Sequence, residues 1–409
     1  MRRSKGFSLQ SQNSSNNSQY LNYIKYLSSN EQSYTAVDLD PIKEEVEARI
    51  QRPEAAFEKQ KNESDPNKRK NLKIPSALYN PDVLRQIRQM KRHSPYFMYL
   101  ITLVQILGLV FSVIKNYYST HRFVADLNEN PMIGPYPSTL INLGARFLPC
   151  MQPTNFTGTD CPPGIVSSKH YTQYQVDEYG QFMAVDQTSN YCTIADICGM
   201  GMQEGEPPYQ WFRFILPIFL HAGVVHLLFN LIFQIRTGFP MEKEFGTWRM
   251  AIIYMLSGIF GFMFEAKSVG YSPSVGCSGA LYGLLACLLL DLIQSWKIIV
   301  KPWWELFKLL ILIVISLGFG LIPYIDNFAH IGGFIMGLLT GIILLPIIVF
   351  SKKGLIIKRF LMVISTFAVA FLFVWALREF YINGKVCKWC KYLSCIPIKE
   401  GWCDYESMY

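Results

Sequence analysis

The sequence is poor in charged residues. Only 17% of its 409 residues are Asp, Glu, Lys or Arg, whereas 50% are hydrophobic, and the mean hydropathy is +0.18. An average soluble domain carries about 25% charged residues, so this composition argues against a single soluble domain and favours a protein that crosses a membrane several times. The net charge of +8 does not indicate a nucleic-acid partner, because the basic residues lie before and between the apolar segments.

Motifs for common cofactors are missing as well. The sequence contains no EF-hand loop, no nucleotide-binding motif, and no inverted repeat of the kind that is typical of transporters. His221 and His226 could suggest a metal site, but residues five apart lie roughly 140° apart around an ideal helix. We therefore expect no cofactor, no metal and no nucleic-acid partner.

Apolar and polar segments alternate in a way that predicts an all-α polytopic membrane protein with seven spans. After the first span, six more apolar segments lie at 214–235, 250–266, 277–295, 306–325, 328–350 and 360–377. The predicted organisation is a mostly disordered cytosolic region (1–92), a first span (93–115), a lumenal loop (116–212), a core with spans two to six (213–350), a seventh span (351–379) and a lumenal Cys-rich tail (380–409).

Basic residues predict the orientation of these spans. Cytosolic loops of membrane proteins are enriched in Lys and Arg, and four basic residues precede the first span. Seven spans that start from the cytosol place the C-terminus on the lumenal or extracellular side. The loops that this topology makes cytosolic contain Arg236, Lys243 and Arg249, then Lys297 and Lys301, then Lys352, Lys353, Lys358 and Arg359.

Cysteines and a glycosylation sequon support the same orientation. Even numbers of cysteines in polar segments on an oxidising side indicate disulfides, although the spacing in "CKWC" also suits a zinc site. The sequence leaves the pairing open. Asn155 begins a sequon in the same loop and is expected to be glycosylated there, unlike Asn13, Asn16 and Asn62 in the cytosol. The two sets of four are Cys150, Cys161, Cys192 and Cys198 in the loop, and Cys387, Cys390, Cys395 and Cys403 in the tail.

Few polar side chains lie inside the predicted spans, and they fall at similar depths. Span two carries His221, His226 and Asn230, span four begins near Ser278, and span six carries His330. Polar groups in a membrane are costly and often functional, although a single His or Asn can also join two helices by a hydrogen bond. In the predicted topology all of them lie near the lumenal side, which favours one shared site.

Small residues beside the serine and the histidine predict close helix packing. Stripes of glycine allow helix backbones to approach, and so could bring a hydroxyl within reach of an imidazole. Packing and reactivity are therefore compatible explanations of the stretch "VGCSGALYG". The stripes are Gly279 and Gly283 after Ser278, and Gly333, Gly337 and Gly341 after His330.

The chemistry that such a site permits is acyl transfer. His330 can take the proton from Ser278 Oγ as this oxygen attacks a peptide carbonyl, and can return it to the leaving amine. The side chains of His226 and Asn230 and the backbone N–H of Ser278 are candidate donors to the oxyanion. Asp326 lies one turn before His330, but its position at the membrane edge favours a Ser-His dyad over a triad.

Three motifs on alternate spans resemble the rhomboid family of intramembrane serine proteases. They are "HAGVVHLLFN", "GCSGALYG" and "AHIGGFIMG", and the resemblance covers about residues 125–350. "ENPMIGPYPSTLINLGA" and "DNFAHIGGF" are similar to the eukaryotic secretory-pathway branch, which has six core helices and a seventh at the end. The tail "CKWCKYLSCIP" is similar to that of fungal members.

The resemblance implies a role for each residue of the motifs. Ser278 is implied as the nucleophile and His330 as the general base, with His226 and Asn230 at the oxyanion site. His221 is implied as a structural hydrogen-bonding residue, Gly276 as part of the same site, and Tyr282 as a ring against His330. Outside the site, it implies Arg213 as half of a Trp-Arg pair, although Phe212 replaces the Trp, and structural roles for Glu242, Gly246 and Arg249.

The function implied by the resemblance is cleavage of single-pass membrane proteins within or near their transmembrane segment. A scissile bond must first be unwound, because a regular helix hides its carbonyl groups. The implied location is the secretory pathway, at the Golgi, endosome or plasma membrane, with membrane lipid as a constant partner. Some relatives are inactive and act in the trafficking or quality control of membrane clients, and this is the alternative.

Overall fold

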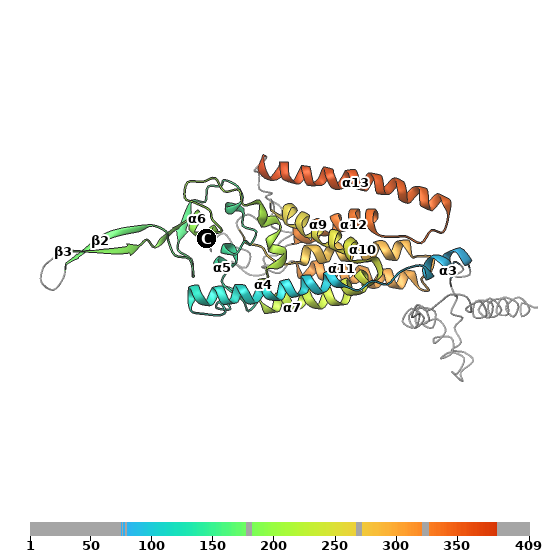
Figure 1. The fold of residues 1–409 in the computed structure, drawn as a ribbon, viewed down its shortest axis with the longest axis horizontal. Coiled ribbons are helices and arrows are strands. Elements are labelled where there is room, and N and C mark those ends of the chain that lie inside the picture. The colour runs from blue at the N-terminus through green and yellow to red at the C-terminus, as the bar shows by residue number, and fades with distance from the viewer. Residues whose placement is uncertain are drawn as a thin grey trace, which may run out of the picture. The chain divides into compact units, whose positions relative to one another are not determined.

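The computed structural model describes residues 75, 77, 80–176, 182–266, 272–320 and 327–382, without the side chains of residues 84, 88, 171–176, 182–188 and 319. Most of these residues are helical, which confirms the predicted helical membrane architecture (Figure 1). The predicted disorder of residues 1–74 and the tail cysteines lie outside the described residues. Part of the predicted N-terminal region is ordered, because it contains helix α3 (Pro81–Arg88). The side chain of Asn80 caps this helix by accepting a hydrogen bond from the N–H of Asp82.

Seven apolar helical segments correspond to the predicted spans. Five of them are long and apolar enough to cross a membrane, whereas α10 has only 17 residues. A π-helical turn, η6 (Gln234–Gly238), joins α7 to α8 within the second segment. The segments are α4 (Tyr96–Thr120), α7 (Val224–Phe233) with α8 (Phe239–Phe245), α9 (Thr247–Glu265), α10 (Ser278–Gln294), α11 (Pro302–Phe319), α12 (Asn327–Leu344) and α13 (Lys352–Tyr381).

Close packing of α9, α10 and α12 forms the centre of the bundle. A Cβ atom on Gly333 would lie 2.0 Å from the carbonyl oxygen of Gly279, and one on Gly337 would lie 2.4 Å from the Cα of Gly283. No side chain larger than hydrogen fits between these backbones. The glycine stripes of α10 and α12 therefore face each other, as predicted, and bring the beginnings of the two helices together.

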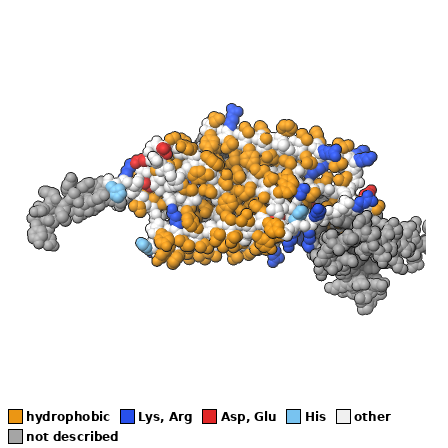
Figure 2. All heavy atoms as spheres, in the orientation of Figure 1, with side chains coloured by type: hydrophobic (Ala, Val, Ile, Leu, Met, Phe, Trp, Pro, Cys, Tyr) orange, Lys and Arg blue, Asp and Glu red, His pale blue; other side chains and the backbone are white. Residues whose placement is uncertain are grey.

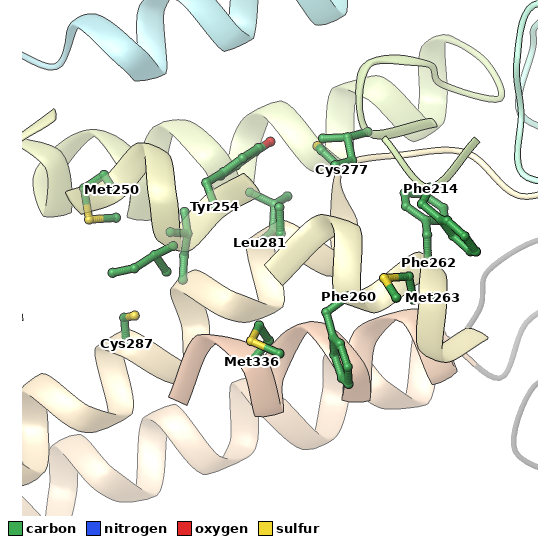
Figure 3. Close-up of a cluster of buried hydrophobic side chains, with 14 of the residues drawn as sticks. Phe214, Met250, Tyr254, Phe260, Phe262, Met263, Cys277, Leu281, Cys287 and Met336 are labelled. Atoms are coloured by element: carbon green, nitrogen blue, oxygen red, sulfur yellow. The ribbon is translucent and has the colours of Figure 1, made fainter. Parts of the chain in front are cut away.

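The hydrophobic core surrounds this contact. Figure 3 shows Tyr254, Phe260, Leu281 and Met336 among the buried side chains between α9, α10 and α12. By contrast, α11 and α13 expose much of their apolar surface, as expected of helices that face lipid. Hydrophobic side chains also cover most of the flank of the bundle (Figure 2).

The loop between α4 and α7 contains strands that the all-α prediction missed. β1 (Gly158–Asp160) pairs antiparallel with β4 (Tyr191–Thr193), and β2 (His170–Val176) pairs with β3 (Phe182–Thr188) from His170 opposite Thr188 to Val176 opposite Phe182. Tyr, Thr and Val are frequent in these strands and favour extended backbone. The short helices of the loop are α5 (Pro137–Asn142), η3 (Leu148–Cys150), α6 (Ile194–Cys198), η4 (Trp211–Phe214) and η5 (Leu216–Phe219).

The four cysteines of this loop form two disulfides, as predicted. Cys150 pairs with Cys198, and Cys161 pairs with Cys192, so both bonds stay within the loop. The Cys150–Cys198 bond lies in a small buried cluster with Ile141. The disulfides therefore supply part of the core of a segment that has few apolar residues of its own.

Candidate active site

Ser278 and His330 meet at the beginnings of two neighbouring helices. Ser278 is the first residue of α10, and His330 lies in the first turn of α12. Ser278 Oγ and His330 Nε2 are 2.8 Å apart, which is the distance of a hydrogen bond. The imidazole is buried, whereas Ser278 is partly exposed. A nucleophile and a base are thus in contact, and the hydroxyl is open to an incoming group.

The second nitrogen of His330 has no partner in the described part of the chain. His330 Nδ1 is buried and makes no hydrogen bond to a described residue. Asp326, the weaker candidate for a third member, lies outside the described residues. Among the described residues, Ser278 and His330 form a pair, and the other described contacts of the imidazole contribute to its orientation.

The ring of Tyr282 supplies one of these contacts. Tyr282 lies one turn after Ser278 on α10, and its ring stacks on that of His330 with centroids 4.2 Å apart and planes 10° apart. This is the arrangement that the family resemblance implied. The stack limits tilting of the imidazole ring, and the hydrogen bond to Ser278 sets the position of Nε2.

His226 and Asn230 lie beside Gly276, two residues before the serine. Gly276 has φ +123°, and a Cβ atom there would lie 2.7 Å from His226 Cε1 and 3.7 Å from Asn230 Nδ2. The amide group of Asn230 is buried, and its Nδ2 makes no hydrogen bond to a described residue. An unused donor in a buried position, beside the segment that leads to Ser278, is suited to stabilise a developing negative charge.

His221 lies behind this group and contacts the residue next to the serine. Its Nε2 lies 3.6 Å from Cys277 Sγ, and its ring packs edge-on against that of His226 with centroids 5.3 Å apart. His221 is fully buried, so it supports the site without reaching an incoming group. No three His, Cys, Asp or Glu side chains gather as metal ligands in the described ranges.

A buried ion pair that was not predicted from the sequence holds the segment leading to the serine. The side chains of Arg146 and Glu265, at the end of α9, form an ion pair and are both fully buried. The backbone N–H and carbonyl groups of Arg146 also exchange two hydrogen bonds of 2.9 Å with Ser274. Glu265 could have indicated such a pair in the sequence, because an acidic residue at the end of an apolar span requires a partner.

Arg213 joins three segments of the loop through its side chain, and Phe212 stands where the resemblance implies a Trp. Its guanidinium group is fully buried and donates hydrogen bonds to the side chain of Gln210 and to the carbonyl groups of Ile141, Ala145 and Cys198. Burial lowers the pKa of Arg213 to about 9, so it remains a cation at neutral pH. Trp211 is exposed and packs against Phe212 instead.

Glu242 caps the first transmembrane helix. Its carboxylate accepts hydrogen bonds from the N–H groups of Phe97 (2.9 Å) and Met98 (2.8 Å) at the start of α4, and from the hydroxyl of Thr247. Gly246, with φ +91°, ends α8, and Arg249 donates to the carbonyl of Phe245. These contacts all lie at the end of the bundle away from Ser278, and they are structural.

Comparison with known proteins supports the motifs. The model of the Rhomboid domain matches residues 208–347, which include every residue of the site. The chain is 30% identical over 400 residues to the Rhomboid-type serine protease 2 of Emericella nidulans, covering 81% of this chain and 76% of the relative.

Relatives of a second kind are also similar. The Inactive rhomboid protein 1 of Homo sapiens is 39% identical over 267 residues, and that of Danio rerio is 36% identical over 297 residues. These matches cover 62% and 70% of this chain, but only 31% and 33% of the relatives. Similarity alone therefore does not separate a protease from an inactive relative.

Proposed function

The chain belongs to the rhomboid family, and from this premise we propose that it is an intramembrane serine endopeptidase that cleaves single-pass membrane proteins within or near their transmembrane segment. The observation that carries the proposal is the 2.8 Å contact between Ser278 Oγ and His330 Nε2. An inactive protein has no need to keep a partly exposed hydroxyl against a buried imidazole. The relative from Emericella nidulans, named a protease, gives further support.

The proposed reaction has two steps. In the first, Ser278 Oγ attacks the scissile carbonyl carbon while His330 Nε2 takes the hydroxyl proton, and the same nitrogen then gives that proton to the leaving amine. In the second, His330 takes a proton from water, whose oxygen attacks the ester on Ser278. The proton returns to Oγ as the ester bond breaks. The product is a free carboxylate.

Donors for the oxyanion lie on the other side of the serine. The free Nδ2 of Asn230 and the imidazole of His226 lie beside Gly276 and are directed at the segment that carries Ser278. Together with the backbone N–H of Ser278 they can stabilise the negative charge that develops on the carbonyl oxygen. Removal of one such donor lowers catalysis by about 100- to 1000-fold in other serine proteases.

The competing function is that of an inactive family member that binds membrane clients. It has support from the similarity to the inactive rhomboid proteins, which exceeds 35% identity over the matched region. Cys277, the neighbour of the serine, is small and points toward His221. It therefore leaves the Ser278 hydroxyl open, and this favours the protease.

The test is cleavage of a single-pass reporter protein co-expressed with the wild type, with Ser278→Ala and with His330→Ala. We expect a product with the wild type alone. Ser295→Ala, at the other end of α10, is a matched control that should leave cleavage unchanged, since its hydroxyl lies far from Ser278 and donates a 3.4 Å hydrogen bond to Asp291.

Labelling with a fluorophosphonate distinguishes an active enzyme that does not accept the reporter from an inactive protein. If the reporter is not cleaved but wild-type Ser278 is labelled and the label is lost in His330→Ala, the enzyme is active and requires a different substrate. If folded protein shows neither cleavage nor labelling, the inactive family member is the correct assignment.

The proposed location is the secretory pathway, with the N-terminus in the cytosol and the active site near the lumenal side. The disulfides of the loop support this placement, because such bonds persist in oxidising compartments. The distribution of basic residues between the spans supports the same orientation.

A further inference from the structure

A cavity of about 430 Å³ lies at the end of the bundle opposite the active site. It is formed by the beginning of α9, the end of α12 with the loop that follows, and the first turns of α13. His330 and Leu344 are 14 residues apart on α12, so the cavity is roughly 20 Å along the helix from the catalytic site. It is therefore separate from the site already described.

The composition of the cavity wall is amphiphilic. Eight of the eleven lining residues are apolar, including Trp248, Leu355 and Met362, and the other three are the cations Arg249, Lys358 and Arg359. No acidic residue is among the lining residues that the structure describes. A wall of this kind is suited to a ligand with an apolar part and an anionic part.

Each of the three cations keeps hydrogen-bond donors available. Lys358 Nζ donates one bond, of 3.2 Å, to the carbonyl of Leu345, and an ammonium group has three donors. Arg249 donates one bond to Phe245 and lies 4.7 Å over the ring of Trp248, while Arg359 is exposed. None of them pairs with a carboxylate in the described part of the chain, so their charge is not neutralised within the protein.

The position of the cavity in the bundle points to the source of the ligand. It lies at the end where the predicted topology places the cytosolic leaflet, and Figure 2 shows most of the visible Lys and Arg side chains toward the end that carries α3 and the start of α13. The cytosolic leaflet contains anionic phospholipids, and basic pockets between transmembrane helices on this side bind their head groups. A free phosphate ion would bind to the cations but would make no contact that explains the eight apolar residues.

We propose that this cavity binds an anionic phospholipid of the cytosolic leaflet. The phosphate lies against Lys358, Arg359 and the free donors of Arg249, and the first carbons of an acyl chain lie against the apolar wall. Since the cavity joins α9 and α12 to α13, the lipid connects the seventh helix to the core of the bundle at this end.

The experiment measures binding of fluorescent phosphatidylserine and phosphatidylcholine to the full-length chain in a neutral detergent. We expect the serine lipid to bind and the choline lipid to bind at least about tenfold more weakly. The combined substitution Lys358→Gln and Arg359→Gln should weaken binding of the serine lipid by roughly ten- to thirtyfold, because each cation near a membrane surface contributes about one kcal/mol.

A matched variant separates a site from general charge attraction. Lys352→Gln with Lys353→Gln removes the same charge from the same end of α13, but these exposed residues do not line the cavity. It should change binding by less than about twofold. Equal losses in the two variants, or equal binding of both lipids, would overturn the proposal. Displacement of the lipid by inorganic phosphate would assign the cavity to anions alone and overturn it as well.

Folding of the variants is checked by size-exclusion chromatography and thermal unfolding in the same detergent. Neither measurement depends on the proposed protease activity. If the double variant does not fold, Arg359→Gln alone keeps the test decisive, because this side chain is exposed and its replacement should not disturb the fold. It should still weaken binding of phosphatidylserine severalfold, and unchanged binding would contradict the proposal.

Discussion

The ring of Tyr282 lies almost parallel to the imidazole of His330, with 4.2 Å between their centroids. Tyr282 follows Ser278 by four residues, which is about one turn of α10. The hydroxyl of Ser278 and the ring of Tyr282 therefore lie on the same face of the helix, toward His330. The hydroxyl of Tyr282 is buried, and in the described part of the chain it makes no hydrogen bond to His330. We infer that the ring, and not its hydroxyl, positions the base.

Substitutions at Tyr282 distinguish the ring from the hydroxyl. Tyr282→Phe keeps the stack and should retain most of the activity, whereas Tyr282→Ala removes a contact of about 1 kcal/mol and should lower the rate of Ser278 labelling about fivefold. The measurement is fluorophosphonate labelling of variants that elute as folded protein. Equal losses in the two variants would assign the role to the hydroxyl instead.

Gly276 is expected to tolerate no side chain. Its φ of +123° strains any other residue, and a Cβ atom would lie 2.7 Å from His226. Gly276→Ala should displace His226 or the backbone beside Ser278 and lower cleavage by about a hundredfold. The control is Gly318→Ala on α11, where a Cβ atom meets no atom of the described residues within 4 Å and activity should not change. A fully active Gly276→Ala protein would show that His226 does not need its present position.

The sequence was sufficient to predict which residues gather at the site, for a physical reason. Polar groups are so costly inside a membrane that the few present, such as Ser278 and His330, stand out against the apolar spans. The glycine stripes then predicted which helices approach closely, and the structure shows Gly333 against Gly279. Roles in catalysis remain predictions.

Features that depend on contacts between distant residues could not be predicted in this way. Arg146 and Glu265 are 119 residues apart, and nothing in the local pattern around Arg146 identifies its partner. The strands β1–β4 were missed because short strands in a polar, disulfide-linked loop lack the long apolar periodicity on which the assignment of the spans depended. The pairing of the loop cysteines likewise cannot be predicted from the sequence, because it depends on which distant residues the fold brings together.

Glu242 is predicted to stabilise the bundle by capping α4. Glu242→Ala would leave the part-buried N–H group of Phe97 and the buried N–H group of Met98 without an acceptor and should lower the free energy of unfolding by roughly 2–3 kcal/mol. Glu242→Gln keeps one acceptor oxygen and should cost less. The check is thermal unfolding in detergent. Glu305→Ala is the control, because its exposed ion pair with Lys308 contributes less than about 1 kcal/mol.

The two disulfides should stabilise the protein by similar amounts, because each restricts the conformations of the unfolded chain. They should differ in their effect on the folded loop. The bonds enclose separations of 48 and 31 residues, which correspond to about 4 kcal/mol each. Replacing Cys150 and Cys198 by Ala should also loosen the carbonyl of Cys198 that binds Arg213, so this pair should have the larger effect on thermal unfolding. Peptide mapping without reduction should recover both pairs, and a loop cysteine linked to a tail cysteine would contradict the pairing.

Asn155 provides a test of the orientation of the whole chain. The sequon Asn155-Phe156-Thr157 lies in the disulfide-linked loop, and both Asn155 and Thr157 are exposed, so a glycosylating enzyme can reach the acceptor. If this loop is lumenal, the expressed protein should lose mass on treatment with an N-glycosidase, and Asn155→Gln should abolish that shift. Asn62→Gln, in the region predicted to be cytosolic, should leave the shift unchanged. A glycan at Asn13, Asn16 or Asn62 would reverse the predicted orientation and would place the active site, and the cavity at the opposite end, on the other sides of the membrane.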